Sequence, residues 1–421
     1  MSGKNNNAQA QPDLVCFSHL RWDFVFQRPQ HLLTRCARDR RVFFVEEPIF
    51  GNGSMKLEVR EAGEVDTGVQ VVVPHLPEGL RSEVATTAVM KEMIRRLFSD
   101  QGIREYIFWY YTPMALSFTK SFSPVASIYD CMDELSAFKG AHSRLADFEQ
   151  ELFRSVDLVF TGGQSLYEAK RNQHRAVHAF PSSIDAAHFG KARTFESDPA
   201  DQKNIPPPRL GFFGVIDERF DIELLDAVAT KRPDWQFVII GPTVKIEPAT
   251  LPRHANIHYL GSKKYEELPG YLAGWDVALL LFARNESTRF ISPTKTPEYL
   301  AAGKPVISTS IRDVVRPYGE LNLVRIADTA DEFIKAAEEL LGHTKSEPGA
   351  VATGSFQTGT DTKWLQKVDA FLADMSWDKT WEQMSNLISQ TIDGKRDAKL
   401  KLHATPKAIR EVKSQSAAVV A

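Results

Sequence analysis

The stretch SPTKTPEYLAAGKPVI, residues 292–307, has the boundary residues of a short helix that leads into a buried strand. Ser292 is a favourable N-cap and Pro293 suits the first helical position, whereas Gly303 and the proline that follows it are typical of a helix end. The N-terminus of a helix attracts anions through its free N–H groups and its dipole. Because Lys295 adds a positive charge on the first turn, the sequence predicts an anion-binding site here.

Glu298 lies one helical turn after Thr294 and Lys295, so the three side chains share one face of the predicted helix. A carboxylate in this place could accept hydrogen bonds from the two hydroxyl groups of a ribose. An ordinary capped helix with a Lys–Glu surface pair is the alternative that the spacing leaves open.

Short apolar runs alternate with helical patterns on both sides of this stretch. The strand-like runs lie at 14–18, 41–45, 106–110, 126–129, 157–161, 209–213, 236–240, 256–260, 276–282, 305–308 and 322–326. A hairpin-like detour, formed by 55–60 and 69–74, interrupts the first series. Alternation of this kind is typical of parallel sheets whose strands are connected by helices. The sequence therefore predicts an α/β protein with two Rossmann-like parallel-sheet domains that face a common cleft.

The same pattern divides the chain into five segments. We expect a first α/β domain over 13–190 and a second over 209–360, joined by the polar, proline-rich linker 191–208. Residues 361–392 are expected to form amphipathic helices. The basic stretch 393–421 is interpreted as a disordered tail, which is either simply solvated or in contact with an anionic membrane or partner.

The composition of the 421-residue chain excludes several classes of protein. Lys plus Arg is 51 and Asp plus Glu is 54, which gives a net charge of −3 and argues against a nucleic-acid partner. The three cysteines form no C-x-x-C pair, which disfavours a disulfide scaffold or a structural zinc site. The N-terminal stretch has no apolar core of a signal peptide, and no apolar run approaches the length of a membrane-spanning helix. We expect a cytoplasmic protein that touches a membrane, if at all, peripherally from its inner face.

Several motifs are missing from the sequence. It contains no G-x-G-x-x-G, no P-loop, no G-x-S-x-G and no H-E-x-x-H. It also contains no Asp-x-Asp, the carboxylate pair that commonly holds a divalent metal on a nucleotide diphosphate. The sequence therefore predicts neither a resident cofactor nor a required metal.

A polar cluster follows the first predicted strand, where ligands of parallel sheets bind. His19 stands at the strand end, Arg21 and Arg28 add positive charge, and Trp22 offers an apolar face to a sugar or a lipid. A loop with one structural tryptophan and solvated arginines is the alternative interpretation.

A second cluster follows a later strand of the first half. Asp130 and Asp133 bracket a turn there, and we expect one of them to face the cleft. Capping of the next helix is the alternative role for both carboxylates.

Taken together, these segments resemble the GT-B glycosyltransferases, specifically the retaining group 1 (family 4-like) enzymes that include many bacterial polysaccharide enzymes. Residues 292–307 are similar to the donor-nucleotide helix of that family, and 210–217 and 233–241 are similar to the first two strands of its donor domain. Residues 17–32 (FSHLRWDFVFQRPQHL) are similar to the start of glycosyltransferases of the teichuronic-acid type. The resemblance covers nearly the whole chain, and it implies that the C-terminal helices cross back to brace the first domain.

The resemblance implies roles for individual residues. Glu298 would bind the ribose of a UDP- or GDP-linked sugar. The other residues around the nucleotide and the diphosphate would be Gly214, Arg219, Gly241, Ser292, Thr294 and Lys295. The catalytic candidates near the sugar are His19, Asp130 and Asp133, and the acceptor side would carry Arg21, Trp22 and Arg28. One position departs from the family pattern, because the first glutamate of its two-glutamate signature falls on Phe290.

The expected function is a retaining, metal-independent transfer of a sugar from a nucleotide sugar to a hydroxyl group of a glycan or lipid-linked glycan, in surface polysaccharide biosynthesis. Catalysis would depend on electrostatic stabilisation of the leaving diphosphate and on positioning of the acceptor. A sugar-nucleotide epimerase with the same fold is one alternative. A non-catalytic nucleotide-sugar-binding protein is the other, and Phe290 is the feature that favours it.

Overall fold

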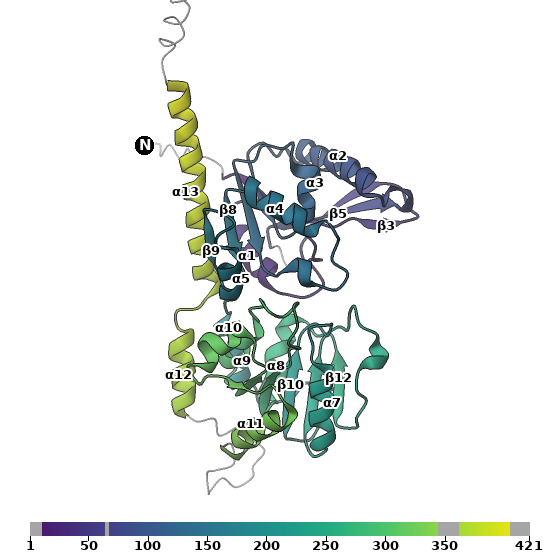
Figure 1. Cartoon of the computed structure of the whole chain (residues 1–421), viewed down its shortest axis with the longest axis vertical. Helices are drawn as coiled ribbons and strands as arrows, with labels where there is room; N and C mark the ends of the chain where they lie inside the picture. Colours follow the sequence, from purple (N-terminus) through teal and green to yellow (C-terminus); the bar gives the residue numbers. More distant parts are fainter. Residues whose placement is uncertain (1–10, 64–66, 344–361, 405–421) are drawn as a thin grey trace, which may run out of the picture.

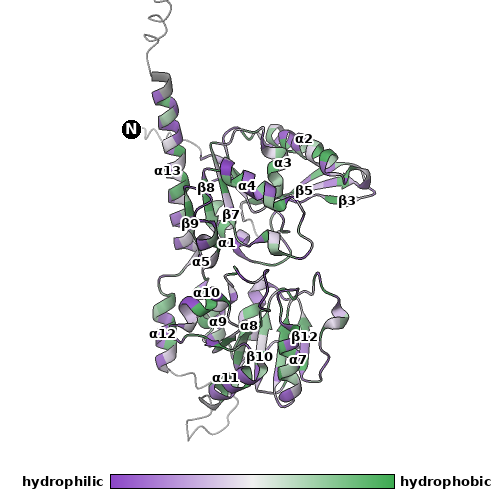
Figure 2. Ribbon diagram, in the orientation of Figure 1, coloured by the Kyte–Doolittle hydropathy of each residue, from purple (hydrophilic) through white to green (hydrophobic). Residues whose placement is uncertain are grey.

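The computed structural model describes residues 11–63, 67–343 and 362–404. Two parallel β-sheets, each covered by helices, are stacked along the long axis of the molecule (Figure 1). The strands are coloured mainly as hydrophobic, whereas the helices show hydrophilic residues on their outer sides (Figure 2). This is the two-domain α/β architecture that the alternating pattern predicts.

The first sheet has the strand order β3-β5-β2-β1-β6-β7-β8-β9, and β4 pairs antiparallel with β5 at one end. Its strands are β1 (Asp13–Ser18), β2 (Val42–Glu46), β3 (Ile49–Gly51), β4 (Lys56–Glu61), β5 (Val69–Pro77), β6 (Tyr106–Tyr110), β7 (Ala126–Cys131), β8 (Leu158–Thr161) and β9 (Val177–Ala179). Its helices are α1 (Arg28–Cys36), α2 (Glu83–Gln101), α3 (Leu116–Thr119), α4 (Leu145–Ser155) and α5 (Gln164–Lys170). The next helix, α6 (Ala186–Gly190), falls within the predicted first domain, but Phe189 is buried in the core of the second domain, so α6 belongs to the second domain. The predicted hairpin is confirmed as β4 and β5.

The second sheet has the order β12-β11-β10-β13-β14-β15, with every pair parallel. Its strands are β10 (Arg209–Phe213), β11 (Gln236–Ile240), β12 (Ile257–Gly261), β13 (Val277–Leu280), β14 (Val306–Ser308) and β15 (Arg325–Ile326). Its helices are α7 (Ile222–Lys231), α8 (Leu268–Ala273), α9 (Lys295–Ala301), α10 (Arg312–Val314) and α11 (Ala330–His343). Two further helices end the described chain, α12 (Thr362–Leu372) and α13 (Trp377–Ala404).

The segment predicted as a linker, 191–208, is part of the second domain. Ala192 and Ile205 are buried in the core beneath the second sheet. Gln202 accepts a hydrogen bond of 2.9 Å from the indole N–H of Trp275 and is itself fully buried. The polar and proline-rich composition of the segment indicated a flexible connection, but its few apolar side chains are enough to fix it in place.

The two C-terminal helices divide between the domains, which differs from the prediction that both pack on the first. Val368 and Leu372 of α12 are buried in the core of the second domain. Only α13 crosses to the first domain, where Trp377, Trp381 and Met384 are buried beside the sheet (Figure 1). The chain passes from one domain to the other between these two helices.

The tail predicted as disordered from residue 393 is helical as far as Ala404, because α13 continues without a break. Lys395 pairs with Asp157 at 2.9 Å and Arg396 pairs with Glu105 at 3.1 Å, so these two charges hold the helix on the first domain. The rest of the predicted tail, 405–421, lies outside the described residues. In the part of the chain that the structure covers, none of the helices has the length and apolarity needed to cross a membrane.

Candidate functional site

A cleft of about 1270 Å³ lies between the two domains. Its first-domain wall comes from the segments that follow β1, β7 and β8, including Asp133 and Gly162. Its second-domain wall comes from the segments that follow β10, β11 and β12 and from the start of α9. All of these segments leave the carboxyl ends of parallel strands, which is where open α/β sheets bind their ligands.

Lys295 projects from the first turn of α9 into this cleft. Its ammonium lies 5.8 Å from the ring centre of Phe212 and 5.9 Å from that of Phe282. No hydrogen bond or ion pair reaches the ammonium from the residues that the structure describes. Desolvation by the surrounding side chains therefore lowers the pKa of Lys295, although the charge of Glu298 partly opposes the shift.

Glu298 lies one turn further along α9 and is buried at the edge of the same cleft. Burial raises the pKa of the Glu298 carboxyl, and the charge of Lys295 acts in the opposite direction. Its carboxylate accepts no hydrogen bond from any described residue. A buried carboxylate without a partner beside an open cavity is suited to accept hydrogen bonds from a ligand.

The start of α9 differs in detail from the prediction. The helix begins at Lys295 with Thr294 in the N-cap position, and neither Thr294 nor Ser292 supplies a side-chain cap. The carbonyl oxygen of Ser292 instead accepts a hydrogen bond of 2.8 Å from the hydroxyl of Ser182 in the first domain. Both Ser292 and Thr294 line the cleft. The predicted end of the helix is confirmed, because Gly303 follows it with a φ of 73°.

Two glycines let the backbone approach the base of the site closely. Gly214 has a φ of 142°, and a Cβ added to it would lie 2.1 Å from Cε of Lys295. Gly241 has a φ of 137°, and its added Cβ would lie 1.9 Å from the carbonyl oxygen of Gly214. A side chain at either position would therefore displace the lysine or separate the ends of β10 and β11.

Arg219 of the second domain and Asp133 of the first domain line opposite walls of the cleft. Arg219 forms a bidentate ion pair with Asp217, with a shortest distance of 2.6 Å, and its guanidinium lies 5.3 Å from the ring centre of Phe138 in the first domain. Desolvation raises the pKa of Asp133 to about 6, against the opposing charges of Arg219 and Lys295. Of the two carboxylates predicted after β7, Asp133 is the one that lines the cleft.

Asp130 points the other way, into the first domain. It is fully buried and paired with Arg28 at 2.9 Å, and Arg28 also donates a hydrogen bond of 2.7 Å to the carbonyl oxygen of Phe180. Burial raises the pKa of Asp130 in spite of this pair. The predicted role of Asp130 near the sugar is therefore replaced by a structural ion pair inside the domain, whereas Arg28 still lines the cleft, with its charge paired to Asp130.

Of the other residues predicted after β1, Trp22 lines the cleft, whereas Arg21 and His19 do not. Arg21 pairs with Glu46 at 2.8 Å and does not line the cavity. Trp22 borders the cavity but packs edge-on against Phe44 in the core, so its face is covered. His19 does not line the cavity, and desolvation lowers its pKa to about 4. Of the predicted positive cluster, Lys295 lines the cleft without a partner, whereas Arg28 and Arg219 line it in ion pairs with Asp130 and Asp217.

Sequence reasoning missed two aromatic residues of the first-domain wall. Phe24 and Phe26 line the cleft, and 43% and 42% of their surfaces are exposed. The ring of Phe26 stacks on Tyr265 of the second domain with the ring centres 4.4 Å apart, so the two walls of the cleft are in contact at this point. Apolar residues in a segment without regular structure were the available signal, because such residues need an external reason to stay exposed.

Phe290, which occupies the place of the family's first glutamate, does not line the cleft. Although it belongs to the second domain, its side chain packs against the core of the first domain that contains Phe17 and Phe153. At this position the protein therefore forms an apolar contact between the domains, where the family pattern has a glutamate.

Comparison with known proteins defines the class. The structure resembles sucrose-phosphate synthase from Thermosynechococcus elongatus with a TM-score of 0.66 and 14% identity, over 91% of this chain and 100% of that one. It also resembles an α,α-trehalose-phosphate synthase (UDP-forming) from Burkholderia xenovorans in complex with glucose-6-phosphate, with a TM-score of 0.62 and 9% identity over 90% and 100% of the two chains. Anabaena HepE in complex with UDP and glucose gives a TM-score of 0.59 at 13% identity, again over 90% and 100%. The chain has the GT-B fold, as predicted.

The sequence of the second domain also matches a known family. Residues 207–343 match the model of the family described as glycosyl transferases group 1, and this segment is a group 1 glycosyl transferase domain. A protein of Bacillus subtilis (strain 168), "Putative teichuronic acid biosynthesis glycosyltransferase TuaH", is 25% identical over 262 residues. That match spans 57% of this chain and 64% of the relative. The predicted resemblance to group 1 glycosyltransferases of the teichuronic-acid type is confirmed.

Proposed function

We propose that the chain transfers a sugar from a nucleoside diphosphate sugar, with UDP as the preferred nucleotide, to a hydroxyl group of a glycan or lipid-linked glycan. The observation that carries this proposal is the unpaired ammonium of Lys295 beside the unpaired carboxylate of Glu298 at the cleft. The two groups match the two polar parts of such a donor, since a cation suits the diphosphate and a carboxylate suits the ribose hydroxyls. The preference for UDP is supported by the nucleotide named with the similar structures.

The chemistry expected at this site is electrostatic. Breaking the bond between the sugar and the diphosphate places negative charge on the leaving group, and Lys295 with Arg219 would stabilise that charge without a metal. Asp133 lines the same cleft, and its carboxylate is suited to contact the acceptor hydroxyl. We propose retention of configuration on the strength of the family resemblance.

The acceptor would bind to the first-domain wall, and a role in surface polysaccharide biosynthesis is supported by the relative from Bacillus subtilis. The exposed ring of Phe24 provides an apolar face for a sugar ring, and it stands next to the exposed ion pair between Asp23 and Arg60. Aromatic faces with polar neighbours are typical of sites that orient an amphipathic ligand. A lipid-linked acceptor would bring the protein to the cytoplasmic face of a membrane.

The function is tested first by thermal shift against a panel of nucleotides and nucleotide sugars, because a ligand that binds the folded state raises the melting temperature, and at equal concentration a tighter ligand raises it more. Transfer is then measured with radiolabelled UDP-sugars and a panel of glycan and lipid-linked acceptors. Acceptor-dependent release of UDP supports the proposal. A change of donor configuration without acceptor would identify an epimerase, and binding without turnover over the whole panel would identify a non-catalytic protein.

Glu298→Gln is expected to weaken nucleotide binding by about 1–3 kcal/mol, because the amide accepts fewer hydrogen bonds from the ribose than the carboxylate does. Isothermal titration with UDP measures the effect. Glu286→Gln is the matched control, since that side chain is exposed and lies outside the cleft. Equal UDP affinity in the wild-type protein and the Glu298→Gln variant would remove Glu298 from the ribose site.

Phe24→Ala is expected to raise the KM for the acceptor by about threefold to tenfold, the range for loss of one aromatic stacking contact. UDP affinity should stay unchanged, because Phe24 belongs to the opposite wall. Phe195→Ala is the control, because Phe195 is equally exposed, at 43%, but does not line the cleft. An unchanged acceptor KM, or an equal rise in the control, would show that Phe24 does not contact the acceptor.

A further inference from the structure

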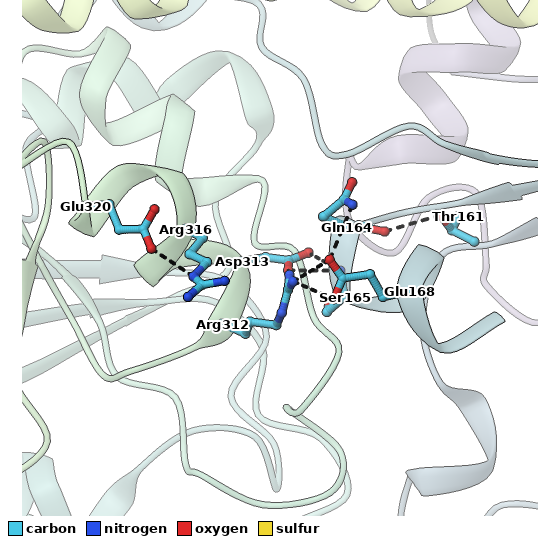
Figure 3. Close-up of polar contacts among 9 residues, drawn as sticks. Thr161, Gln164, Ser165, Glu168, Arg312, Asp313, Arg316 and Glu320 are labelled. Carbon is cyan, nitrogen blue, oxygen red and sulfur yellow. Dashed lines mark hydrogen bonds and ion pairs between the residues drawn. The ribbon is translucent and has the colours of Figure 1, made fainter. Parts of the chain in front are cut away.

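The two domains meet beside the cleft at the first turn of α5 (Figure 3). Gly163 occupies the N-cap position of this helix and has no side chain with which to cap it. Asp313 of α10, in the second domain, caps the helix instead. Its carboxylate accepts the N–H of Ser165 at 3.0 and 3.3 Å, so a helix of one domain is capped by a carboxylate of the other.

Gly163 leaves just enough room for this contact. A Cβ added to it would lie 2.4 Å from Oδ2 of Asp313 and 2.8 Å from Cβ of Ser292. The backbone of Gly163 is extended, with a φ of −162°, so its conformation does not require glycine. Close approach of the second domain is therefore the physical reason for glycine at this position.

The cap is attached to the donor side of the cleft. Ser292 lies against Gly163, the residue that also adjoins the carboxylate of Asp313. Ser292 lines the cleft and lies three residues before Lys295. Its carbonyl oxygen is held by the hydroxyl of Ser182 from the first domain. The loop that leads into α9 thus contacts two residues of the first domain, Gly163 and Ser182, and these contacts exist only while the domains are together.

A second charge pair accompanies the cap at the same junction. Arg312 bonds Glu168 of α5 at 2.6 Å and Asp313 at 3.0 Å (Figure 3). Both Arg312 and Glu168 are partly exposed, so water screens this pair. Asp313 is 6% exposed, and separation of the domains would leave α5 without its cap.

We propose that Asp313 is a positioning residue, which couples closure of the cleft to the order of the donor site by capping α5 across the domain boundary. Closure and capping occur together, because neither domain holds both halves of the contact. The loop before α9 is then fixed with Lys295 and Glu298 facing the first domain. The proposal deepens the proposed function by naming what arranges its site.

The test is Asp313→Ala, followed by hydrogen exchange of individual amides. We expect the Ser165 amide to exchange about tenfold faster, because it loses its acceptor, and the Glu298 amide at the start of α9 to exchange faster as well. Amides of the central strand β6 should stay unchanged, which separates local loosening from general unfolding. Affinity for UDP should fall by about tenfold, the factor that corresponds to one such cap.

Further variants separate the cap from simple loss of a side chain. Gly163→Ala keeps the carboxylate but fills the space that it occupies, so it should loosen the same amides. Its effect should add to that of Asp313→Ala only in part, namely through the contact of the added Cβ with Ser292. Asp313→Asn retains an acceptor oxygen and should restore part of the protection. Glu320→Ala is the control, since Glu320 is exposed and pairs with Arg316 within its own domain.

The outcomes distinguish this proposal from the proposed function. Unchanged exchange at Ser165 in Asp313→Ala overturns the cap, whether or not the protein transfers sugars. Faster exchange at Ser165 with unchanged exchange at Glu298 overturns the coupling to the donor site. A wild-type protein that binds no nucleotide contradicts the proposed function, whereas the exchange ratios still decide the role of Asp313.

Discussion

Replacement of Lys295 by methionine is expected to lower kcat for sugar transfer by about 10²–10³-fold, the range for loss of one group that stabilises developing negative charge. Methionine fills the space between the rings of Phe212 and Phe282 without an ammonium. The melting temperature should stay the same or rise, since a desolvated charge without a partner is removed. Steady-state kinetics with a UDP-sugar and thermal unfolding measure the two effects on one protein sample.

The matched control for this variant is Lys263→Met. Lys263 also lines the cleft, but its ammonium is paired with Asp201 at 2.6 Å. A kcat of Lys295→Met that is reduced by less than about threefold would contradict the role of Lys295 at the diphosphate, because even a loss of 1.36 kcal/mol corresponds to a tenfold reduction.

The variant Lys295→Arg tests whether the charge of Lys295 explains the pH dependence of donor binding, because arginine keeps its proton at alkaline pH. Donor binding by the wild-type protein should weaken as the pH rises through the lowered pKa of Lys295, whereas binding by the arginine variant should not.

Asp130→Ala is expected to destabilise the first domain by about 3–5 kcal/mol, because it leaves Arg28 buried without its counter-charge. Urea unfolding followed by tryptophan fluorescence measures the change, because four of the seven tryptophans, Trp22, Trp109, Trp377 and Trp381, lie in the core of the same domain. The double variant Arg28→Leu with Asp130→Leu should recover much of the loss, since an apolar pair can replace a buried ion pair. This recovery is the signature of a structural pair.

The surface pair between Arg41 and Asp13 provides the control for this experiment. Arg41 is half exposed, so Asp13→Ala should cost at most about 1 kcal/mol. A stable Asp130→Asn variant with no transfer activity would contradict our assignment and return Asp130 to a catalytic role. Asp133, which lines the cleft, is the carboxylate for which loss of activity without loss of stability is expected.

Much of the fold was predictable because it depends on local patterns. Runs such as 209–213 and 236–240 are short, apolar and separated by helical segments, so their place in a parallel sheet follows from periodicity alone. The helix around Glu298 was also predictable, since proline and glycine fix its two ends. Failures occurred where composition was ambiguous, as in the segment 191–208, whose few apolar residues are enough to bury it.

The functional residues on the second-domain wall of the cleft were predictable from the sequence, whereas those on the first-domain wall were much less so. Lys295, Glu298 and the two glycines lie in or next to short segments whose turns and helix ends are marked by local residues. The polar residues after β1 and β7 depend instead on side-chain direction, which sequence spacing does not determine. Asp130 and Asp133 are separated by two residues, yet one is buried with Arg28 and the other faces the cleft.

The sequence by itself therefore determined the class of fold, the tandem arrangement of two sheets and the helix that carries Lys295 and Glu298, because periodicity, caps and glycines act within a few residues. Only the tertiary structure decided which charges remain without partners. Arg21 and Arg28 find carboxylates far away in the chain, and Asp313 finds a helix of the other domain. Such pairings depend on distances between elements that meet only in the folded molecule, and these pairings leave Lys295 as the unpaired cation that the described residues present to the cleft.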